Sequence, residues 1–168
     1  FGKRISDPEL LRAAETWSPE HGNMLIIGDS GLGKTSAMGL MALLMLRAGY
    51  REGGERWDCA RSLCWATAPE LSDGTRAHPF GRGYVPTVER AKRARVLFLD
   101  ELGWDDDPGP VSRVLGERDA RERPTVMTSG MTMDQLMEHY GDALVRRMTT
   151  FCGRDSTVIE ATERVGAI

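Results

Sequence analysis

The stretch "IIGDSGLGKTS", Ile26 to Ser36, decides the fold of this 168-residue chain. It fits the pattern G-x-x-x-x-G-K-[ST] without a mismatch. In this pattern glycines let backbone N–H groups turn inward on phosphates, the lysine places a charge at the β/γ end, and the threonine hydroxyl is a ligand for Mg²⁺. The candidate nucleotide-binding residues are Gly28, Asp29, Ser30, Gly31, Leu32, Gly33, Lys34, Thr35 and Ser36. A Gly-rich turn without a ligand is the alternative, but a predicted strand before the motif and a predicted helix after it favour a phosphate cradle.

A second motif, "RVLFLDELG", places two carboxylates at the end of an apolar run. Such a run is typical of a buried parallel strand, and ligands bind at the carboxyl ends of these strands. We expect Asp100 to hold Mg²⁺ together with Thr35, and Glu101 to polarise an attacking water as a general base. Lys34 and Glu101 are accordingly candidate catalytic residues. A strand that ends in a solvated acidic turn is the alternative.

The rest of the chain alternates between strand and helix patterns. Five segments rich in apolar and β-branched residues predict strands, at 23–28, 62–67, 95–100, 125–130 and 156–161. Three segments with apolar residues at helical spacing predict helices, at 34–48, 111–121 and 132–148. Thr132 and Gln135 stand in capping-box positions at the start of the last helix. Two segments rich in Gly, Pro and charge predict surface loops, at 51–60 and 72–86. The alternation predicts an α/β fold: a doubly wound five-stranded parallel sheet with helices on both faces.

The composition is that of an ordinary soluble domain, with 40% hydrophobic residues, 28% charged residues and a net charge of −3. This balance excludes a strongly basic protein that coats nucleic acid, so any DNA contact needs a local patch. The longest apolar run, Met38 to Leu46, is far shorter than the roughly 20 residues that cross a bilayer. We therefore expect a cytoplasmic protein without membrane contact.

Cysteines and acidic residues give no strong metal signal. The chain has three cysteines, Cys59, Cys64 and Cys152. They form no CxxC pair, which predicts free thiols in a reducing cytosol; a zinc site of the first two with His78 is the alternative. The run Asp105 to Asp107 before Pro108 is predicted to be a solvated loop that leads into the next helix.

Four stretches occur in the order and spacing of a known family: "LIIGDSGLGKT", "VLFLDELG", "RERPTVMTSGMT" and "YGDALVRRM". Together they resemble AAA+ ATPases of the DnaC/IstB group, which are bacterial and phage helicase loaders and transposition helper ATPases. The first two motifs, Walker A and Walker B, are shared by many P-loop ATPases, and the last two carry the narrower assignment. The resemblance implies an AAA+ core that uses ATP/ADP and Mg²⁺.

The resemblance also implies that the 125–130 strand lies between the cradle strand and the Asp100 strand. This order places Thr128 and Ser129 near the γ-phosphate as candidate sensor residues. Where the family usually has an asparagine, this chain has Gly130. The alternatives are that Thr128 or Ser129 substitutes for the asparagine and that sensing is weak.

The stretch "ALVRRM" matches the family's box that supplies an arginine finger to the neighbouring subunit. Arg147 stands at the position of the finger, and Arg146 beside it is a secondary candidate. A guanidinium stays charged and bonds phosphate oxygens in pairs, and such fingers increase rates by roughly 10³- to 10⁵-fold. A finger in trans implies a nucleotide-dependent homo-oligomer. Two exposed arginines near a helix C-terminus are the alternative.

The resemblance covers essentially the whole chain and implies a single AAA+ ATPase domain over residues 1–168, with the helical lid absent or minimal. We expect truncation at the N-terminus, because loaders commonly carry a partner-binding segment before residues like "FGKRISDPELLRAAETW".

The leading hypothesis is an ATP-hydrolysing helicase loader in DNA replication, whose nucleotide state controls self-assembly and engagement of a replicative helicase and single-stranded DNA. The alternatives are an IstB-type transposition helper, a P-loop small-molecule kinase with the 72–86 loop as its lid, and a non-hydrolysing nucleotide-binding module. Two patches are candidate DNA contacts. One is the basic cluster Lys92, Arg93 and Arg95, and the other combines positive charge with aromatic rings at Arg76, His78, Phe80, Arg82 and Tyr84. A solvated charged face is the alternative for both.

Overall fold

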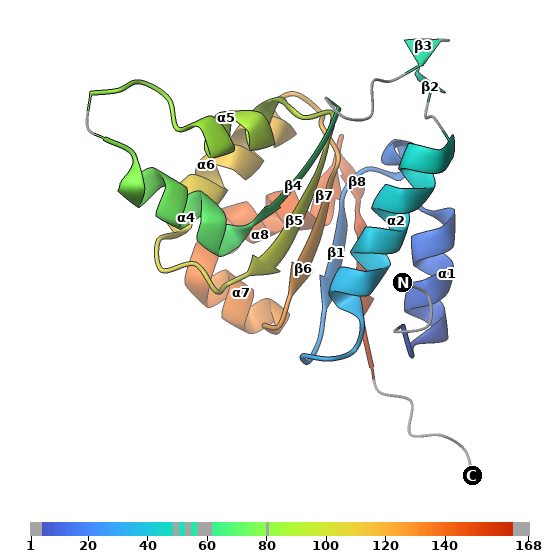
Figure 1. Ribbon diagram of the computed structural model, residues 1–168. Coiled ribbons are helices and arrows are strands. Elements are labelled where there is room, and N and C mark those ends of the chain that lie inside the picture. The colour runs from blue at the N-terminus through green and yellow to red at the C-terminus, as the bar shows by residue number, and fades with distance from the viewer. Residues whose placement is uncertain (1–4, 49–50, 53–54, 57–61, 80, 163–168) are drawn as a thin grey trace.

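The fold is built on a five-stranded parallel sheet, and the carboxyl ends of its strands point the same way (Figure 1). The computed structural model describes residues 5–48, 51–52, 55–56, 62–79 and 81–162. The strand order is β4 (Leu63–Thr67), β5 (Val96–Leu102), β6 (Thr125–Ser129), β1 (Met24–Ile27) and β9 (Thr157–Glu160). All five predicted strands are confirmed, and β6 lies between β1 and β5 as the resemblance implies.

The central strands are covered on both faces, which agrees with the apolar and β-branched residues that predict them. Every residue of β1 and β6 is buried, whereas β4 and β9 at the edges are partly exposed. Because side chains alternate along a strand, Leu25 and Ile27 enter one hydrophobic core and Met24 and Ile26 enter the other. The sheet therefore separates two cores.

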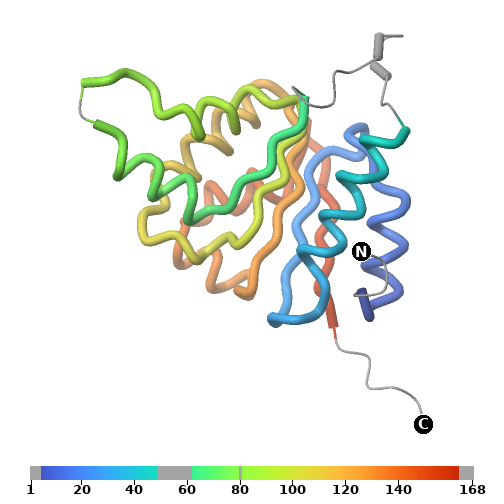
Figure 2. Tube along the Cα trace, in the orientation of Figure 1, coloured from blue at the N-terminus to red at the C-terminus, as the bar shows by residue number. Residues whose placement is uncertain are grey.

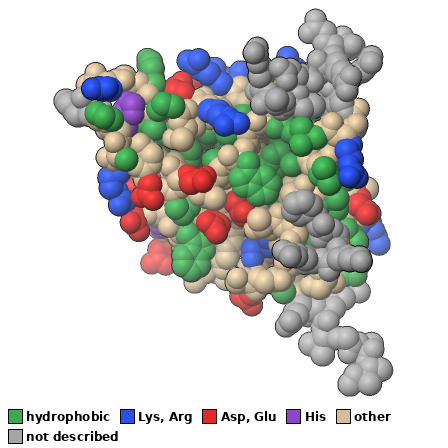
Figure 3. All heavy atoms as spheres, in the orientation of Figure 1, with side chains coloured by type: hydrophobic (Ala, Val, Ile, Leu, Met, Phe, Trp, Pro, Cys, Tyr) green, Lys and Arg blue, Asp and Glu red, His purple; other side chains and the backbone are tan. Residues whose placement is uncertain are grey.

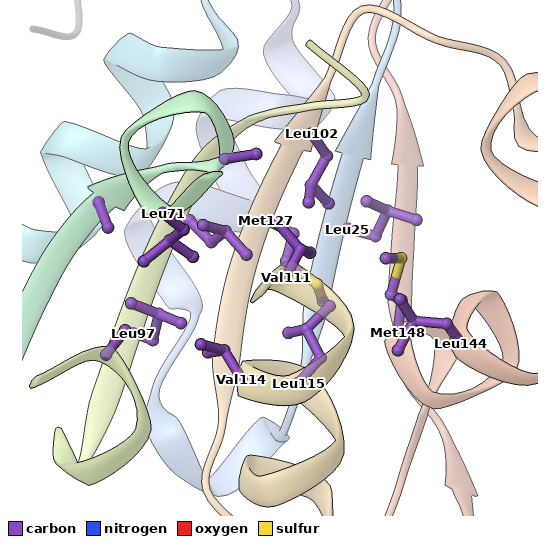
Figure 4. Close-up of a cluster of buried hydrophobic side chains, with 14 of the residues drawn as sticks. Leu25, Leu71, Leu97, Leu102, Val111, Val114, Leu115, Met127, Leu144 and Met148 are labelled. Carbon is purple, nitrogen blue, oxygen red and sulfur yellow. The ribbon is translucent and has the colours of Figure 1, made fainter. Parts of the chain in front are cut away.

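Among the described residues, two helices cover one face of the sheet and five cover the other. On the first face, α1 (Pro8–Thr16) and α2 (Lys34–Ala48) lie side by side (Figure 2). The second face carries α4 (Ala68–Ala77), α5 (Pro86–Arg93), α6 (Pro108–Asp119), α7 (Met133–Tyr140) and α8 (Asp142–Thr149). Their apolar side chains meet those of the strands in the core that Figure 4 shows. No helix of the described segments is long and apolar enough to span a bilayer.

The remaining elements are short. They are a 3₁₀ turn (Pro19–His21) and two antiparallel pairs, β2 (Arg51–Glu52) with β3 (Glu55–Arg56) and β7 (Thr150–Phe151) with β8 (Arg154–Asp155). The first pair lies within the segment predicted to be a loop at 51–60, most of which falls outside the described residues.

The prediction of one helix over 132–148 is wrong, because Gly141 divides it into α7 and α8. The Gly141 backbone has a φ of 81°, which is incompatible with a continuous α-helix. Its N–H donates a hydrogen bond to the carbonyl oxygen of Met137 and so ends α7. The predicted capping box of Thr132 and Gln135 at the start of α7 is confirmed.

The prediction of a loop over 72–86 is also wrong in its first half, which belongs to α4. This helix begins after Thr67, whose hydroxyl accepts from the Glu70 N–H while the Glu70 carboxylate accepts from the Thr67 N–H. Leu71 packs into the core and anchors an otherwise polar helix. The predicted helix at 111–121 begins earlier, at Pro108, where the Asp107 carboxylate caps it.

Candidate functional site

The loop between β1 and α2 lies at the carboxyl edge of the sheet (Figure 1). Gly28 begins this loop with a φ of 134°, and a Cβ there would stand 2.5 Å from the carbonyl oxygen of Ala161. Gly31 and Gly33 each have a φ of 89°. Only glycine adopts these conformations without strain. The loop leads directly into α2, whose N-terminal end carries unpaired backbone N–H groups and a partial positive charge.

The Lys34 side chain is folded back on this loop. Its Nζ donates hydrogen bonds to the carbonyl oxygens of Gly28 at 2.5 Å and Asp29 at 2.6 Å. Burial lowers the pKa of Lys34, and the nearby carboxylates of Asp29 and Asp100 partly offset that shift. A phosphate that replaced the two carbonyls would receive charge-assisted hydrogen bonds from the same ammonium group.

Asp100 is the centre of a hydrogen-bond network that joins α2, β5 and β6. Its Oδ1 accepts from the Thr35 hydroxyl at 3.2 Å, from the Glu101 N–H at 3.1 Å and from the Thr128 hydroxyl. The Asp100 side chain is buried, and within the described residues its Oδ2 accepts no hydrogen bond. The structure thus brings together side chains from both sequence motifs and from the third stretch.

Glu101 stands in an irregular part of β5. The register between β5 and β6 shifts between Leu99 and Leu102, and the Glu101 backbone has a φ of 60°. A non-glycine residue in the left-handed region costs about 1–2 kcal/mol. Strain of this kind persists where the surrounding structure imposes it and is concentrated at functional sites. Here it accompanies a carboxylate that is exposed although its strand neighbours are buried.

A cavity of about 760 Å³ lies over these residues. It is lined by Ser30, Gly31, Gly33, Lys34, Thr35, Ser36, Pro69, Asp100, Glu101, Trp104, Thr128, Ser129 and Gly130. A second cavity of about 420 Å³ lies on the other side of the loop and shares Ser30, Gly31 and Gly130 with the first. It is also lined by Gly28, Asp29 and Leu32, so the two cavities together contact every residue of the sequence-predicted nucleotide set.

The oxygen ligands that line the larger cavity suit Mg²⁺. The Thr35 hydroxyl and the Asp100 carboxylate are hard oxygen ligands of the kind that Mg²⁺ prefers. Among the described residues that line the cavity, Lys34 alone carries a positive side-chain charge, against the carboxylates of Asp100 and Glu101. Within the described residues no cluster of three or more His, Cys, Asp or Glu side chains could hold a metal alone. The Thr35 and Asp100 oxygens therefore suit an ion that also takes water and phosphate oxygens as ligands.

The two candidate sensor residues line the larger cavity, but their hydroxyl groups are engaged. Thr128 donates to Asp100, and Ser129 donates to the carbonyl oxygen of Leu102 at 2.8 Å. Ser129 also accepts from the Met131 N–H at 3.0 Å. Both side chains are buried.

The arginines of α8 are not part of this cavity. The Arg147 side chain is half exposed, and its Nε lies 3.7 Å from the Asp119 carboxylate on α6. Arg146 is exposed as well. Asn23 fixes the end of this helix, because its Nδ2 donates to the carbonyl oxygens of Arg147 and Thr150, both at 3.0 Å.

The prediction that Asp105 to Asp107 form a solvated loop is wrong for Asp105, whose side chain is fully buried. Its Oδ1 accepts from the Gly103 N–H at 3.2 Å and from the Tyr140 hydroxyl. That hydroxyl also accepts from the Gly103 N–H at 2.9 Å. This network ties α7 to the turn after Glu101. Sequence reasoning missed Tyr140, and its only signal was a place on the apolar stripe of the helix.

Several positive charges proposed for DNA contact are paired with carboxylates. Arg76 lies 3.3 Å from Asp106, while Lys92 and Arg93 lie 3.1 Å and 3.5 Å from Glu89. Figure 3 shows Lys and Arg side chains scattered over one face rather than gathered in one patch. The described residues on this face therefore offer no dense basic surface.

Cys59, a predicted free thiol, and Phe80, a candidate DNA contact, lie outside the described residues. Tyr84 is strongly exposed. Cys64 and Cys152 are free thiols, the first buried and the second exposed. Burial raises the pKa of Cys64.

Comparisons with known proteins bear on the fold. No family model matches the chain, and no curated protein matches its sequence. Solved structures do match. A DnaI structure is 20% identical with a TM-score of 0.67 over 92% of this chain and 81% of its own. The chain has the AAA+ fold.

Two further AAA+ structures extend this comparison. The DnaC helicase loader is 18% identical, with a TM-score of 0.60, over 90% of this chain and 86% of its own. The replication initiator DnaA bound to AMPPCP and single-stranded DNA is 18% identical, with a TM-score of 0.65, over 92% of this chain. This chain spans 45% of that DnaA chain, less than half its length.

Proposed function

We propose that this AAA+ domain binds ATP with Mg²⁺, hydrolyses it, and serves in DNA replication as a helicase loader. The observation that carries the proposal is one cavity lined by Lys34, Thr35, Asp100 and Glu101. These four groups supply an ammonium charge, a hydroxyl ligand, a carboxylate ligand and a candidate general base. Phosphoryl transfer requires this combination of positioning and electrostatic stabilisation.

Each residue has a role that follows from its chemistry. The loop N–H groups and Lys34 would bind the β- and γ-phosphates, and the nucleoside end would extend toward the second cavity. Thr35 and Asp100 would hold Mg²⁺, which neutralises phosphate charge when bound. Glu101 would take a proton from a water whose oxygen attacks the γ-phosphorus, and the bond from that phosphorus to the β–γ bridging oxygen breaks to give ADP and phosphate.

A Glu101→Gln substitution tests hydrolysis. It keeps the size of the side chain but removes the base, so phosphate release should fall by about 10²-fold or more while Mg-ATP still binds. The assay measures released phosphate, with and without single-stranded DNA, over a series of protein concentrations. Equal turnover by the wild type and the variant under all these conditions would contradict the ATPase proposal.

Self-assembly is the second part of the proposal, and it rests on Arg147. This side chain is half exposed and does not line the cavity of its own chain, as a finger that serves a neighbouring copy requires. Arg147→Ala should leave Mg-ATP affinity nearly intact and remove the dependence of hydrolysis on protein concentration. Arg146→Ala tests the secondary candidate, and Arg12→Ala on α1, at the opposite face of the sheet, is the matched control. A loss of affinity in the Arg147 variant would show a structural role instead.

Engagement of a helicase and of single-stranded DNA is the third part. The DnaC match is a helicase loader, and the DnaA match carries single-stranded DNA. Copurification with a hexameric replicative helicase, compared with a transposase, separates the loader from a transposition helper. Binding to the transposase alone would overturn the loader proposal.

A nucleotide-binding module that does not hydrolyse ATP is a second candidate. The engaged hydroxyls of Thr128 and Ser129 and the missing side chain of Gly130 favour it, because they leave β6 without a free side-chain donor at the cavity. The Glu101→Gln comparison distinguishes the two candidates.

A further inference from the structure

The side of the larger cavity formed by β5 and β6 lacks free side-chain donors at most of its positions. The hydroxyl hydrogens of Thr128 and Ser129 are used on Asp100 and on the Leu102 carbonyl. Gly130 has no side chain, and carboxylates only accept hydrogen bonds when ionised. A phosphate on this side would therefore find acceptors where it needs donors.

Trp104 supplies a donor at this place. It follows Glu101 by three residues, and its backbone N–H closes the turn on the Glu101 carbonyl at 3.3 Å. Its indole lines the cavity and is 70% exposed, which is unusual for a side chain of this size. Among the described residues no hydrogen-bond partner of the indole Nε1 is found, and this nitrogen can only donate.

The indole lies close to Gly130. The Trp104 Nε1 lies 3.6 Å from the point at which a Cβ on Gly130 would stand. A longer side chain at position 130 would compete with the indole for this space. The N–H of Trp104 therefore lies within contact distance of the place that a side chain of residue 130 would enter.

We propose that the Trp104 indole N–H donates a hydrogen bond to the terminal phosphate of the bound nucleoside triphosphate, and so makes the site prefer a triphosphate to a diphosphate. The inference rests on the proposed nucleotide binding. A donor beside a phosphate forms a charge-assisted hydrogen bond, which is stronger than a neutral one. A diphosphate lacks the terminal group, so the same donor adds nothing to its binding.

The test measures Kd for Mg-AMPPCP, a non-hydrolysable triphosphate, and for Mg-ADP by calorimetry. Trp104→Phe keeps an aromatic ring and removes the N–H. We expect triphosphate affinity to fall roughly 10- to 100-fold, the effect of losing a hydrogen bond to a charged group, while diphosphate affinity stays constant. Trp65→Phe is the matched control, because Trp65 is a partly exposed tryptophan on β4 that lines neither of the two cavities at the loop.

A second variant guards against a purely structural effect. In the Trp104→Phe background, Gly130→Asn places an amide donor beside the same space and should recover part of the triphosphate preference. An unchanged ratio of the two affinities in Trp104→Phe, or an equal loss for both nucleotides, would overturn this inference alone. If the wild type binds neither nucleotide, the proposed function fails and this inference fails with it.

Discussion

Tyr140 should hold the turn after Glu101 in place, and the substitution Tyr140→Phe tests the contribution of its hydroxyl group. The substitution removes the hydrogen bond to the buried Asp105 carboxylate and the one accepted from the Gly103 N–H. A hydrogen bond to a charged group contributes about 1.5–3 kcal/mol, and a neutral one about 0.5–1.5 kcal/mol. Gly103 keeps its bond to Asp105, so we expect a net loss of about 2–3 kcal/mol in the free energy of unfolding.

Urea denaturation measures this loss. With a slope of about 1–3 kcal/mol/M for a small protein, the midpoint should fall by roughly 1 M. Tyr84→Phe is the control, because Tyr84 is 79% exposed and its hydroxyl should contribute little. The same Tyr140 variant should release phosphate more slowly while its Mg-ATP affinity stays close to that of the wild type, since the turn carries Glu101 but not the phosphate loop.

The pH dependence gives an independent check. Burial, then the hydrogen bond and charge of Asp105, raise the pKa of Tyr140 above its ordinary value, although the Gly103 N–H lowers it slightly. Above pH of about 10 the unfolded chain loses this proton while the folded chain keeps it, so the stabilisation falls as pH rises. The difference in unfolding free energy between wild type and Tyr140→Phe should therefore shrink above that pH. A midpoint shift no larger than that of Tyr84→Phe, or a difference independent of pH, would refute this reasoning.

Three other expectations follow from the geometry of the site. Gly28→Ala should lower the free energy of unfolding by at least about 2 kcal/mol in urea denaturation, because the new Cβ combines a strained φ with overlap on a backbone carbonyl. Gly130→Ala is the control: its Cβ would make an ordinary contact, so the free energy of unfolding should change by less than about 0.5 kcal/mol. Equal effects of the two substitutions would contradict strain at Gly28. Glu101→Gly should leave the free energy of unfolding unchanged or raise it by up to about 1 kcal/mol, because relief of the positive φ outweighs the added entropy of the unfolded chain. The same variant should lose phosphate release. A clear destabilisation in the same denaturation would count against strain at Glu101. Chelation of Mg²⁺ should weaken ATP binding measured by calorimetry, because the described cavity lining has two carboxylates and one lysine, and without the ion these carboxylates repel the phosphates. An ATP affinity that does not change on chelation would argue against a metal held there.

The sheet could be predicted from the sequence because its strands are encoded locally. β1 and residues 96–99 of β5 are continuous apolar runs, and β6 is rich in β-branched residues. The structure buries every residue of these three strands except Glu101. The phosphate loop is local as well, since all its parts lie within eleven residues, Ile26 to Ser36. The order of the strands in the sheet was predicted from the family resemblance rather than from periodicity.

The helices that were missed are short, with eight to ten residues each. α1 begins at Asp7–Pro8 and α5 at Val85–Pro86, in both cases with proline in the first turn. α4 begins with the capping box of Thr67 and Glu70. These start signals are readable in the sequence, but an amphipathic stripe of two or three apolar residues is too short to detect by periodicity.

Buried polar residues were missed for a different reason. The Arg118 side chain is 1% exposed, and its guanidinium donates to the carbonyl oxygens of Ala91, Ala94 and Pro124 at 2.7–2.8 Å. Burial lowers the pKa of Arg118 to about 9, so the group stays charged at neutral pH. A charged residue in a helical pattern is normally predicted to be solvated, and only the fold shows that two separate segments, 91–94 and 124–125, converge on this guanidinium.

The same limit applies to Asn23, which connects the strand before the phosphate loop with α8. β1 begins beside Asn23 and ends at the phosphate loop. The Asn23 amide clamps the carbonyls of Arg147 and Thr150 and also accepts from the Thr125 N–H at 2.9 Å. These partners lie 102 to 127 positions away along the chain. A motif search finds residues whose partners are near in sequence, whereas a buried amide that positions α8 against β1 acts only through tertiary contacts. The residues that arrange a site are therefore harder to predict than those that form it, even when the loop itself is unmistakable.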